Sequence, residues 1–312
     1  MSLLDQVRAT APYQWAAQIK RDVVQKRRER VARVLLRLPP YPVPAPTSNL
    51  TSIHLLTSRR DWIGALWSVR TFLEFLGEPL PVFFHDDGTL DAGIIQQLQN
   101  FFPGAVVVTA KEADSVAGQQ LKDYPRCATA RRRHVLNYKL FDPAFFTLGP
   151  RYLLLDSDLL FFRPPVEIAQ WMRGGERVNL WNEDQGDFLN ITPAEAQQRH
   201  GVKLCERLNS GLGCVWRESV DFKLLEDYFS HESVWAHPHR VEQTGYALLT
   251  GNFGGRLLPR TYLIDTTRTL GVPDHIVMKH YVGKIRDLFY AEGINHLLAQ
   301  NFVPGAQAGA KS

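Results

Sequence analysis

Two aspartates interrupt an otherwise apolar run, YLLLDSDLLFF, between Tyr152 and Phe162. Burying an unpaired carboxylate costs several kcal/mol or forces the group to take up a proton. The chain must therefore turn towards water at Asp156 and Asp158, or place a positive group beside them. Residues two apart in an extended chain point the same way, so both carboxylates can reach one target while Ser157 points away.

Two carboxylates in one place suit a hard divalent cation such as Mg²⁺ or Mn²⁺. A cation held there would in turn bind a diphosphate group. A plain Asp-Ser-Asp turn between two strands explains the same letters without any ligand. The elements that surround the pair decide between these two interpretations.

Short apolar runs alternate with amphipathic segments on the N-terminal side of the aspartates. The runs SIHLLTS, PVFFHDDG and AVVVTA are typical of strands, whereas residues 61–77 and 92–104 have the apolar spacing of helices. This β-α-β-α-β alternation predicts an α/β fold with a mostly parallel sheet covered by helices. RYLLLDSD is then the next strand, and it places Asp156 at the carboxyl edge, where such sheets bind ligands.

Composition limits the class of protein. The chain has 312 residues, of which 45% are hydrophobic, so a large core is expected. With 36 Lys and Arg against 32 Asp and Glu, the charge is too mild to indicate a nucleic-acid partner. The cysteines at 127, 205 and 214 form no CxxC pair, which favours a reducing compartment over a disulfide scaffold. No secretion signal or membrane-spanning stretch is recognisable, so we expect a cytoplasmic protein.

The chain divides by composition into three parts: a basic helical extension with a Pro-rich linker (1–48), the main domain (49–303) and a disordered tail (304–312). The segment from Lys20 to Arg37 carries eight Lys and Arg residues and two acids. It is interpreted as a helix packed on the main domain or on a partner. The alternative is a basic amphipathic helix at the inner face of a membrane. A homodimer is also compatible with the sequence.

Several common catalytic motifs are absent. The sequence contains no GxxxxGK[ST] phosphate loop, no GxGxxG, no HExxH and no GxSxG. The histidines at 231, 237 and 239 match no zinc-ligand spacing and are interpreted as part of a solvated loop.

The order of five segments resembles one family. YKLFDP, RYLLLDSDLLFF, LNSGLGCVW, EQTGYALL and HYVGKIRDLFY make residues 50–292 similar to the GT-A glycosyltransferases, closest to family 8, the glycogenin and bacterial galactosyltransferase type. The resemblance implies a GT-A fold, with a Rossmann-like sheet. It also implies an enzyme that moves a sugar from a nucleotide donor, expected to be a UDP-sugar, to a hydroxyl acceptor with retention of anomeric configuration.

The resemblance assigns roles to particular residues. Asp156 and Asp158 correspond to the family's metal-binding DxD motif, and His280 to its third Mn²⁺ ligand, although a packed core histidine is the plainer interpretation of His280. The family also has an H-x-x-G-x-x-K motif near the end of the domain. His280 and Gly283 match it, and Arg286 stands in place of the lysine. Arginine keeps the positive charge but changes a point donor into a planar fork. The donor-binding residues implied are Thr57, Ser58, Arg59, Asp86, Lys139, Ser157, Gly283, Lys284 and Arg286.

The residues expected beside the reacting sugar are Asn209, Glu242 and Gln243. The family's second acid in this last segment is replaced by Thr244. This change leaves open a non-catalytic nucleotide-sugar or carbohydrate-binding protein. A sugar nucleotidylyltransferase is a further alternative, but LLTSRRDWIG lacks the glycines that such enzymes have after the first strand. The loops 181–190 and 231–240 are expected to select the acceptor, whose identity no motif encodes.

Overall fold

A seven-stranded sheet with the order β3-β2-β1-β4-β7-β6-β8 forms the centre of the protein. The computed structural model describes residues 30–268 and 271–304. Strands β3, β2, β1 and β4 run parallel, β7 runs antiparallel to β4 and β6, and β8 is parallel to β6. The α/β class with a mostly parallel sheet is confirmed. The strand bounds are β1 Ser52–Thr57, β2 Val82–Asp86, β3 Val106–Val108, β4 Arg151–Leu155, β6 Asn179–Glu183, β7 Leu208–Trp216 and β8 Gly255–Leu257.

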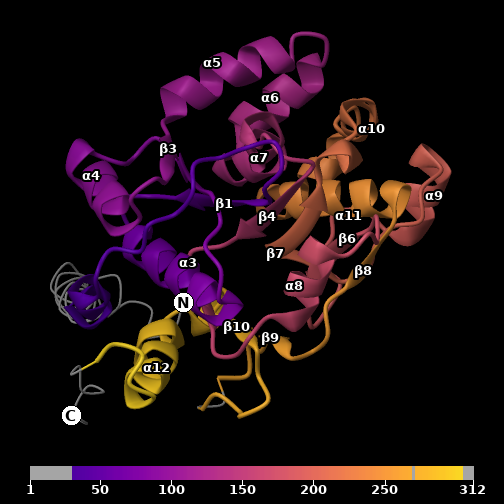
Figure 1. The fold of residues 1–312 in the computed structure, drawn as a ribbon. Coiled ribbons are helices and arrows are strands. Elements are labelled where there is room, and N and C mark those ends of the chain that lie inside the picture. Colours follow the sequence, from indigo (N-terminus) through magenta and orange to yellow (C-terminus); the bar gives the residue numbers. More distant parts are fainter. Residues whose placement is uncertain (1–29, 269–270, 305–312) are drawn as a thin grey trace, which may run out of the picture.

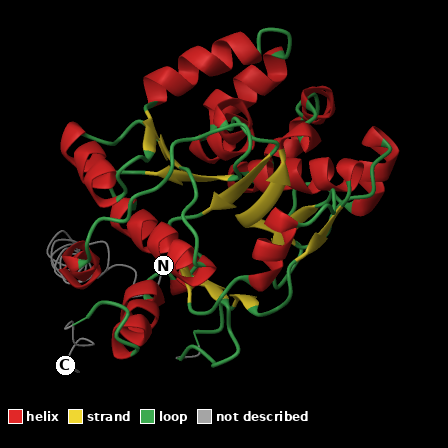
Figure 2. Ribbon diagram, in the orientation of Figure 1, coloured by secondary structure: helices red, strands yellow, loops and turns green. Residues whose placement is uncertain are grey.

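Helices cover both faces of this sheet (Figures 1 and 2). On β4, Leu153 and Leu155 belong to the core cluster that contains helix α3, whereas Tyr152 and Leu154 belong to the cluster that contains α7 and α11. This is the period of two that a strand buried on both sides requires. The helix bounds are α3 Trp62–Leu76, α4 Ala92–Phe101, α5 Ala110–Gln120, α6 Pro125–Arg133, α7 Tyr138–Phe146, α8 Val166–Arg173, α9 Pro193–His200, α10 Phe222–Tyr228, α11 Val241–Phe253 and α12 Asn295–Ala299.

The predicted helix after β1 is confirmed, and its ends have local causes. It is almost entirely buried along its length, and it stops where Gly77 adopts a left-handed conformation with φ 79°. Glycine has no Cβ penalty in that conformation. The next helix, α4, is capped by Asp91, whose side chain accepts a hydrogen bond from the backbone N–H of Ile94.

A second, three-stranded sheet brings the end of the chain to the aspartates. Its order is β5-β10-β9, with β5 at Leu159–Phe161, β9 at Tyr262–Ile264 and β10 at Met278–His280. His280 pairs with Leu159, and the N–H of Tyr281 donates to the carbonyl of Asp158 at 2.9 Å. A backbone pairing across more than a hundred residues therefore places the imidazole beside the Asp-Ser-Asp segment.

The described end of the N-terminal extension packs on the main domain. Ala32 and Leu35 are fully buried, and the indole N–H of Trp67 donates to the carbonyl of Ala32 at 2.7 Å. The Pro-rich segment is extended, and Val43 hydrogen-bonds through its N–H to the carbonyl of Pro103 at 2.8 Å. Residues 1–29 of the predicted helical extension and residues 305–312 of the predicted disordered tail lie outside the described residues, and the domain bounds stay a prediction. Among described residues no helix combines the length and apolarity needed to span a bilayer.

Candidate active site

The two aspartates of the Asp-Ser-Asp segment meet a histidine at the end of β4. His280 Nε2 lies 3.1 Å from Asp158 Oδ1 and 3.8 Å from Asp156 Oδ2. One ligand atom from each residue falls within 4.8 Å of the other two. The chain forms a turn here instead of continuing the strand, so the prediction that Ser157 points away is wrong: Ser157 lines the same cavity as the aspartates.

The imidazole sits in a space that only a glycine leaves open. A Cβ atom on Gly211 would overlap the His280 ring. The ring is 4% exposed, and its Nδ1 has no hydrogen-bond partner. Burial lowers the pKa of His280, but the carboxylates of Asp158 and Asp156 outweigh this and hold the pKa above its usual value.

Two carboxylates and one imidazole form a mixed oxygen and nitrogen donor set that suits Mn²⁺ and also accepts Mg²⁺. The group lies beside a large cavity, and its histidine is a buried side chain with an unsatisfied ring nitrogen. These residues therefore fit the divalent cation that the sequence predicts.

Lys139 forms a second charged cluster directly beside the first. Its Nζ lies 2.7 Å from Asp156 Oδ1 and 3.4 Å from Glu242 Oε1, and it donates to the carbonyl of Ser210 at 3.1 Å. Burial lowers the pKa of Lys139, but the two carboxylates raise it by more, so the amine stays charged. Burial raises the pKa of Glu242 to about 7, and the nearby carboxylate of Asp156 adds to the rise while Lys139 opposes it.

The three residues expected beside the sugar lie together around Ser210. The Ser210 hydroxyl donates to Glu242 Oε2 at 2.9 Å, and its backbone N–H donates to Gln243 Oε1 at 3.4 Å. The Asn209 amide donates to Asp184 at 2.9 Å. Glu242 and Gln243 are thus connected through Ser210 to Lys139, whereas the Asn209 side chain bonds Asp184 and the N–H of Gly211.

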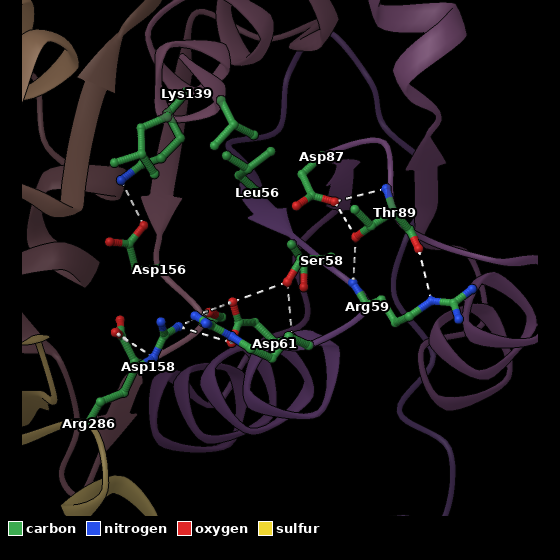
Figure 3. A pocket seen from close by; sticks show the side chains of 15 residues that line it. Leu56, Ser58, Arg59, Asp61, Asp87, Thr89, Lys139, Asp156, Asp158 and Arg286 are labelled. Carbon is green, nitrogen blue, oxygen red and sulfur yellow. Dashed lines mark hydrogen bonds and ion pairs between the residues drawn. The ribbon is translucent and has the colours of Figure 1, made fainter. Parts of the chain in front are cut away.

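A cavity of about 850 Å³ opens in front of both clusters (Figure 3). The predicted Thr57, Ser58 and Arg59 line it from the carboxyl end of β1. Lys139 and the Asp-Ser-Asp turn line it from the other side. This is the edge of the parallel sheet where ligands were expected to bind.

Arg286 reaches the aspartates from the C-terminal segment. Its Nε lies 3.5 Å from Asp158 Oδ2, and its guanidinium donates to the Ser157 hydroxyl at 3.4 Å. The same guanidinium lies 3.2 Å from Asp61 Oδ1. Asp61, which precedes helix α3, also accepts from Ser58 at 3.1 Å and was not singled out by the sequence. An acid just before a helix gives no local signal for a partner so distant in the chain.

Three predicted donor residues do not line this cavity. Asp86 is occupied by its own loop, where it accepts from the N–H groups of Gly88 and Leu90 at 2.8 and 3.0 Å, and its neighbour Asp87 faces the cavity instead. Gly283 and Lys284 are exposed and lie outside the lining. Arg286 is therefore the one member of that segment that reaches the cavity.

Thr244, which replaces an acid of the resembled family, has a structural role. It is fully buried, its hydroxyl donates to the carbonyl of Arg240 at 2.8 Å, and it accepts from the N–H of Asn190 at 2.9 Å. The histidines of the 231–240 loop form no metal cluster within the described ranges. Asp184 was also missed, because its importance depends on its contact with Asn209.

The chain matches no protein-family profile and no curated protein. Its fold is similar to several solved structures. Mouse xyloside xylosyltransferase 1 in its apo form shares 10% identity over 74% of this chain and 97% of that chain, with a TM-score of 0.48. The galactosyltransferase LgtC, in complex with donor and acceptor sugar analogs, shares 14% over 75% and 87%, with a TM-score of 0.45. Core-mannan synthase A from Aspergillus fumigatus, in its Mn/GDP form, shares 10% over 71% and 75%, with a TM-score of 0.43.

These similar structures are all glycosyltransferases, the class that the sequence resembles. Because the identities do not exceed 14% and the TM-scores stay below 0.5, we take no functional assignment from them. The function is instead inferred from the residues around the cavity.

Proposed function

We propose that the protein is a metal-dependent glycosyltransferase that moves a sugar from a nucleotide donor to a hydroxyl acceptor. The observation that carries the proposal is the meeting of Asp156, Asp158 and His280 at the wall of a cavity of about 850 Å³. A cavity of this size lies in the range of small-molecule sites, about 300–1,000 Å³. A nucleotide sugar matches both its size and its charged lining.

Asp156, Asp158 and His280 are the residues that would hold Mn²⁺ or Mg²⁺. When bound, the cation supplies a Lewis acid that offsets the negative charge growing on the departing diphosphate.

Arg286 and Lys139 supply fixed positive charge to the same region. Arg286 presents a planar fork that can donate two hydrogen bonds to phosphate oxygens. Lys139 is held in place by Asp156 and Glu242, so its charge needs no rearrangement during the reaction. Preorganised charges of this kind commonly contribute a factor of about 10²–10³ to the rate. Lys284 has no part in this proposal because it does not line the cavity.

The sugar is transferred by exchange of one bond for another. The bond from the anomeric carbon to the diphosphate oxygen breaks, and a bond to the acceptor oxygen forms on the same face of the sugar. The acceptor's proton passes to the departing diphosphate. Glu242 does not line the cavity, but it accepts a hydrogen bond from Ser210 and lies beside Lys139. Its proposed role is therefore to position Ser210 and the charge of Lys139 next to the sugar. Retention and a UDP donor are part of this proposal.

A thermal-shift series with UDP-, GDP- and ADP-sugars tests the proposal. We expect a UDP-sugar to raise the melting temperature when Mn²⁺ is present and to have little effect with EDTA. Slow release of free sugar from the same donor would show turnover. A series in which no nucleotide sugar stabilises the protein with Mn²⁺ would contradict the proposal.

A non-catalytic nucleotide-sugar-binding protein is the second candidate. The observation that favours it is Thr244, which stands where the resembled family has an acid. Its side chain is buried, and its hydroxyl is used in a hydrogen bond to the carbonyl of Arg240. Donor-dependent stabilisation without any Mn²⁺-dependent hydrolysis would support this alternative.

A further inference from the structure

A second cavity, of about 310 Å³, lies between the end of β6 and strand β9. Its charged lining residues are Glu183, Asp184, Arg207 and Arg260, and Leu263 and Ile264 of β9 also line it. It has no lining residue in common with the cavity at the aspartates.

This second cavity adjoins the candidate catalytic residues through direct contacts. Asp184 accepts the hydrogen bond of the Asn209 amide at 2.9 Å. On the neighbouring strands, Ile264 of β9 pairs with His280 of β10. Asn209 therefore contacts the wall of this second cavity, while the carbonyl of its neighbour Ser210 accepts a hydrogen bond from Lys139 at the first cavity. In a transferase the acceptor hydroxyl must reach the sugar bound beside these residues, so the rest of the acceptor needs a site close to them.

The wall chemistry indicates what would bind there. Two guanidinium groups face two carboxylates, so the charged lining sums to zero. Glu183 pairs with Arg207 and lies 3.4 Å from Arg260, whose side chain is 82% exposed. Carboxylates accept hydrogen bonds from hydroxyl groups and guanidinium groups donate to them. Leu263, which is half-buried, offers an apolar surface for the C–H face of a ring.

Arg207 holds its side chain at the cavity with an unusual backbone. Its φ is 55°, in the left-handed region that few non-glycine residues adopt. Its carbonyl accepts from the N–H of Asp184 at 2.8 Å, which ties this strained residue to the cavity wall. Strained backbone positions of this kind concentrate at functional sites.

We propose that this second cavity is the acceptor subsite and that its occupant is an uncharged hexopyranose. The inference rests on the proposed transferase function, because a second sugar site has this meaning only if the first cavity holds a donor. A hexopyranose presents several hydroxyl groups around an apolar ring, which matches a charge-balanced polar lining that also includes a half-buried leucine.

Saturation-transfer NMR with methyl glycosides tests the proposal. The probes are the methyl glycosides of glucose, galactose and mannose, together with methyl glucuronide, added to the full chain with UDP and Mg²⁺. We expect a signal from at least one neutral glycoside, and a weaker one from the glucuronide. Absence of any signal from the neutral glycosides, or a signal from the glucuronide alone, would overturn the assignment.

Two variants locate the binding. Arg260→Ala removes an exposed guanidinium and should reduce the glycoside signal at least fivefold. Arg207→Gly removes the other guanidinium while relieving the backbone strain, so it should raise the melting temperature and still reduce the signal. Arg256→Ala is the matched control, because Arg256 belongs to an exposed pair with Glu176 outside this cavity. Equal signals in Arg260→Ala, Arg207→Gly and the control would overturn the proposal.

UDP titration of the unchanged protein keeps the two proposals apart. Binding of UDP without any glycoside signal would reject the acceptor subsite alone. A glycoside signal without UDP binding would reject the transferase proposal, and with it the acceptor role, in favour of a carbohydrate-binding protein.

Discussion

Two buried charge clusters lie one turn apart on helix α7, and they are built differently. Asp142 receives two hydrogen bonds from Arg131, at 2.6 and 2.9 Å, and both side chains are at most 2% exposed. Arg131 also donates to the exposed Asp114 at 2.6 Å, and Lys139 is likewise shared between two carboxylates, Asp156 and Glu242. We call the first cluster closed, because both oxygens of the buried Asp142 accept hydrogen bonds. We call the second open, because Glu242 Oε1 has no hydrogen-bond partner and Asp156 is 29% exposed towards the large cavity.

The same contrast occurs on strand β10, between two consecutive residues. Lys279 points to one face and donates to the buried Glu292 at 2.7 Å. His280 points to the other face and meets the aspartates. A buried ion pair is therefore not evidence of a site by itself. An open cluster with unsatisfied atoms beside a cavity is the feature that indicates function.

Breaking the closed cluster should give the largest effect on stability. Asp142→Ala leaves the Arg131 guanidinium buried without its main partner, so we expect a loss of about 3–5 kcal/mol in the free energy of unfolding. Urea denaturation measures it. Glu176→Ala, which breaks an exposed pair with Arg256, should change stability very little. A loss in Asp142→Ala no larger than in this control would remove the distinction between the clusters.

Disturbing the open cluster should lower the affinity for the metal more than it lowers the stability of the fold. Gly211→Ala places a methyl group against the His280 ring and displaces it, so we expect Mn²⁺ affinity to fall about 10–100-fold, the range seen when a ligand's support is lost. Isothermal titration with Mn²⁺ measures the change. Gly118→Ala is the control, since a Cβ there meets nothing within 4 Å. Unaltered Mn²⁺ binding in Gly211→Ala would count against His280 as a ligand.

The buried histidines His54 and His85 form a neutral pair away from the aspartates, with a hydrogen bond of 2.9 Å between them. Burial lowers the pKa of His85 to about 3 and that of His54 well below its usual value. The unfolded chain takes up these protons at higher pH, so stability is present above about pH 6.5 and is lost as pH falls. We expect a loss of about 2 kcal/mol between about pH 6.5 and 5.5. His54→Gln should roughly halve the dependence of the unfolding free energy on pH, measured by urea denaturation. An unchanged pH dependence would show that the two histidines are not its cause.

The smallest effect concerns Asp61, which lies beside Arg286 and lines the large cavity at the aspartates. Its carboxylate competes with a bound diphosphate for the same guanidinium. Asp61→Asn should therefore bind UDP about threefold more tightly in the presence of Mn²⁺, because opposite charges no longer pair within the protein. Titration at two salt concentrations measures this. Weaker binding would show that Asp61 positions Arg286 for the diphosphate and does not compete with it.

The sequence was sufficient for the parts of the site that depend on local pattern. The alternation from Ser52 to Asp156 predicts the parallel half of the sheet, and with it the position of the aspartates at a strand end. The apolar runs and helical spacings there are long enough to be decisive. The pairing of β10 with β5, which brings in His280, was implied only by the resemblance, because no local pattern encodes so distant a contact.

Other details of the site depend on the conformation of short turns. Asp86 and Asp87 are adjacent acids, and the loop's own hydrogen bonds decide which of them is left facing the cavity. Lys284 and Arg286 are two residues apart, and the 3₁₀ turn Gly283–Ile285 directs only the arginine to the aspartates. Such choices are made by a few hydrogen bonds that composition and spacing do not specify.

Titration of UDP in the presence and absence of Mn²⁺, on the unchanged protein and on Asp158→Asn, tests the metal site most directly. We predict binding that requires Mn²⁺ in the unchanged protein and is lost in Asp158→Asn, whose circular dichroism and unfolding midpoint should stay nearly unchanged. UDP that binds equally well in EDTA, or equally well to Asp158→Asn, would contradict a donor site built on this cation.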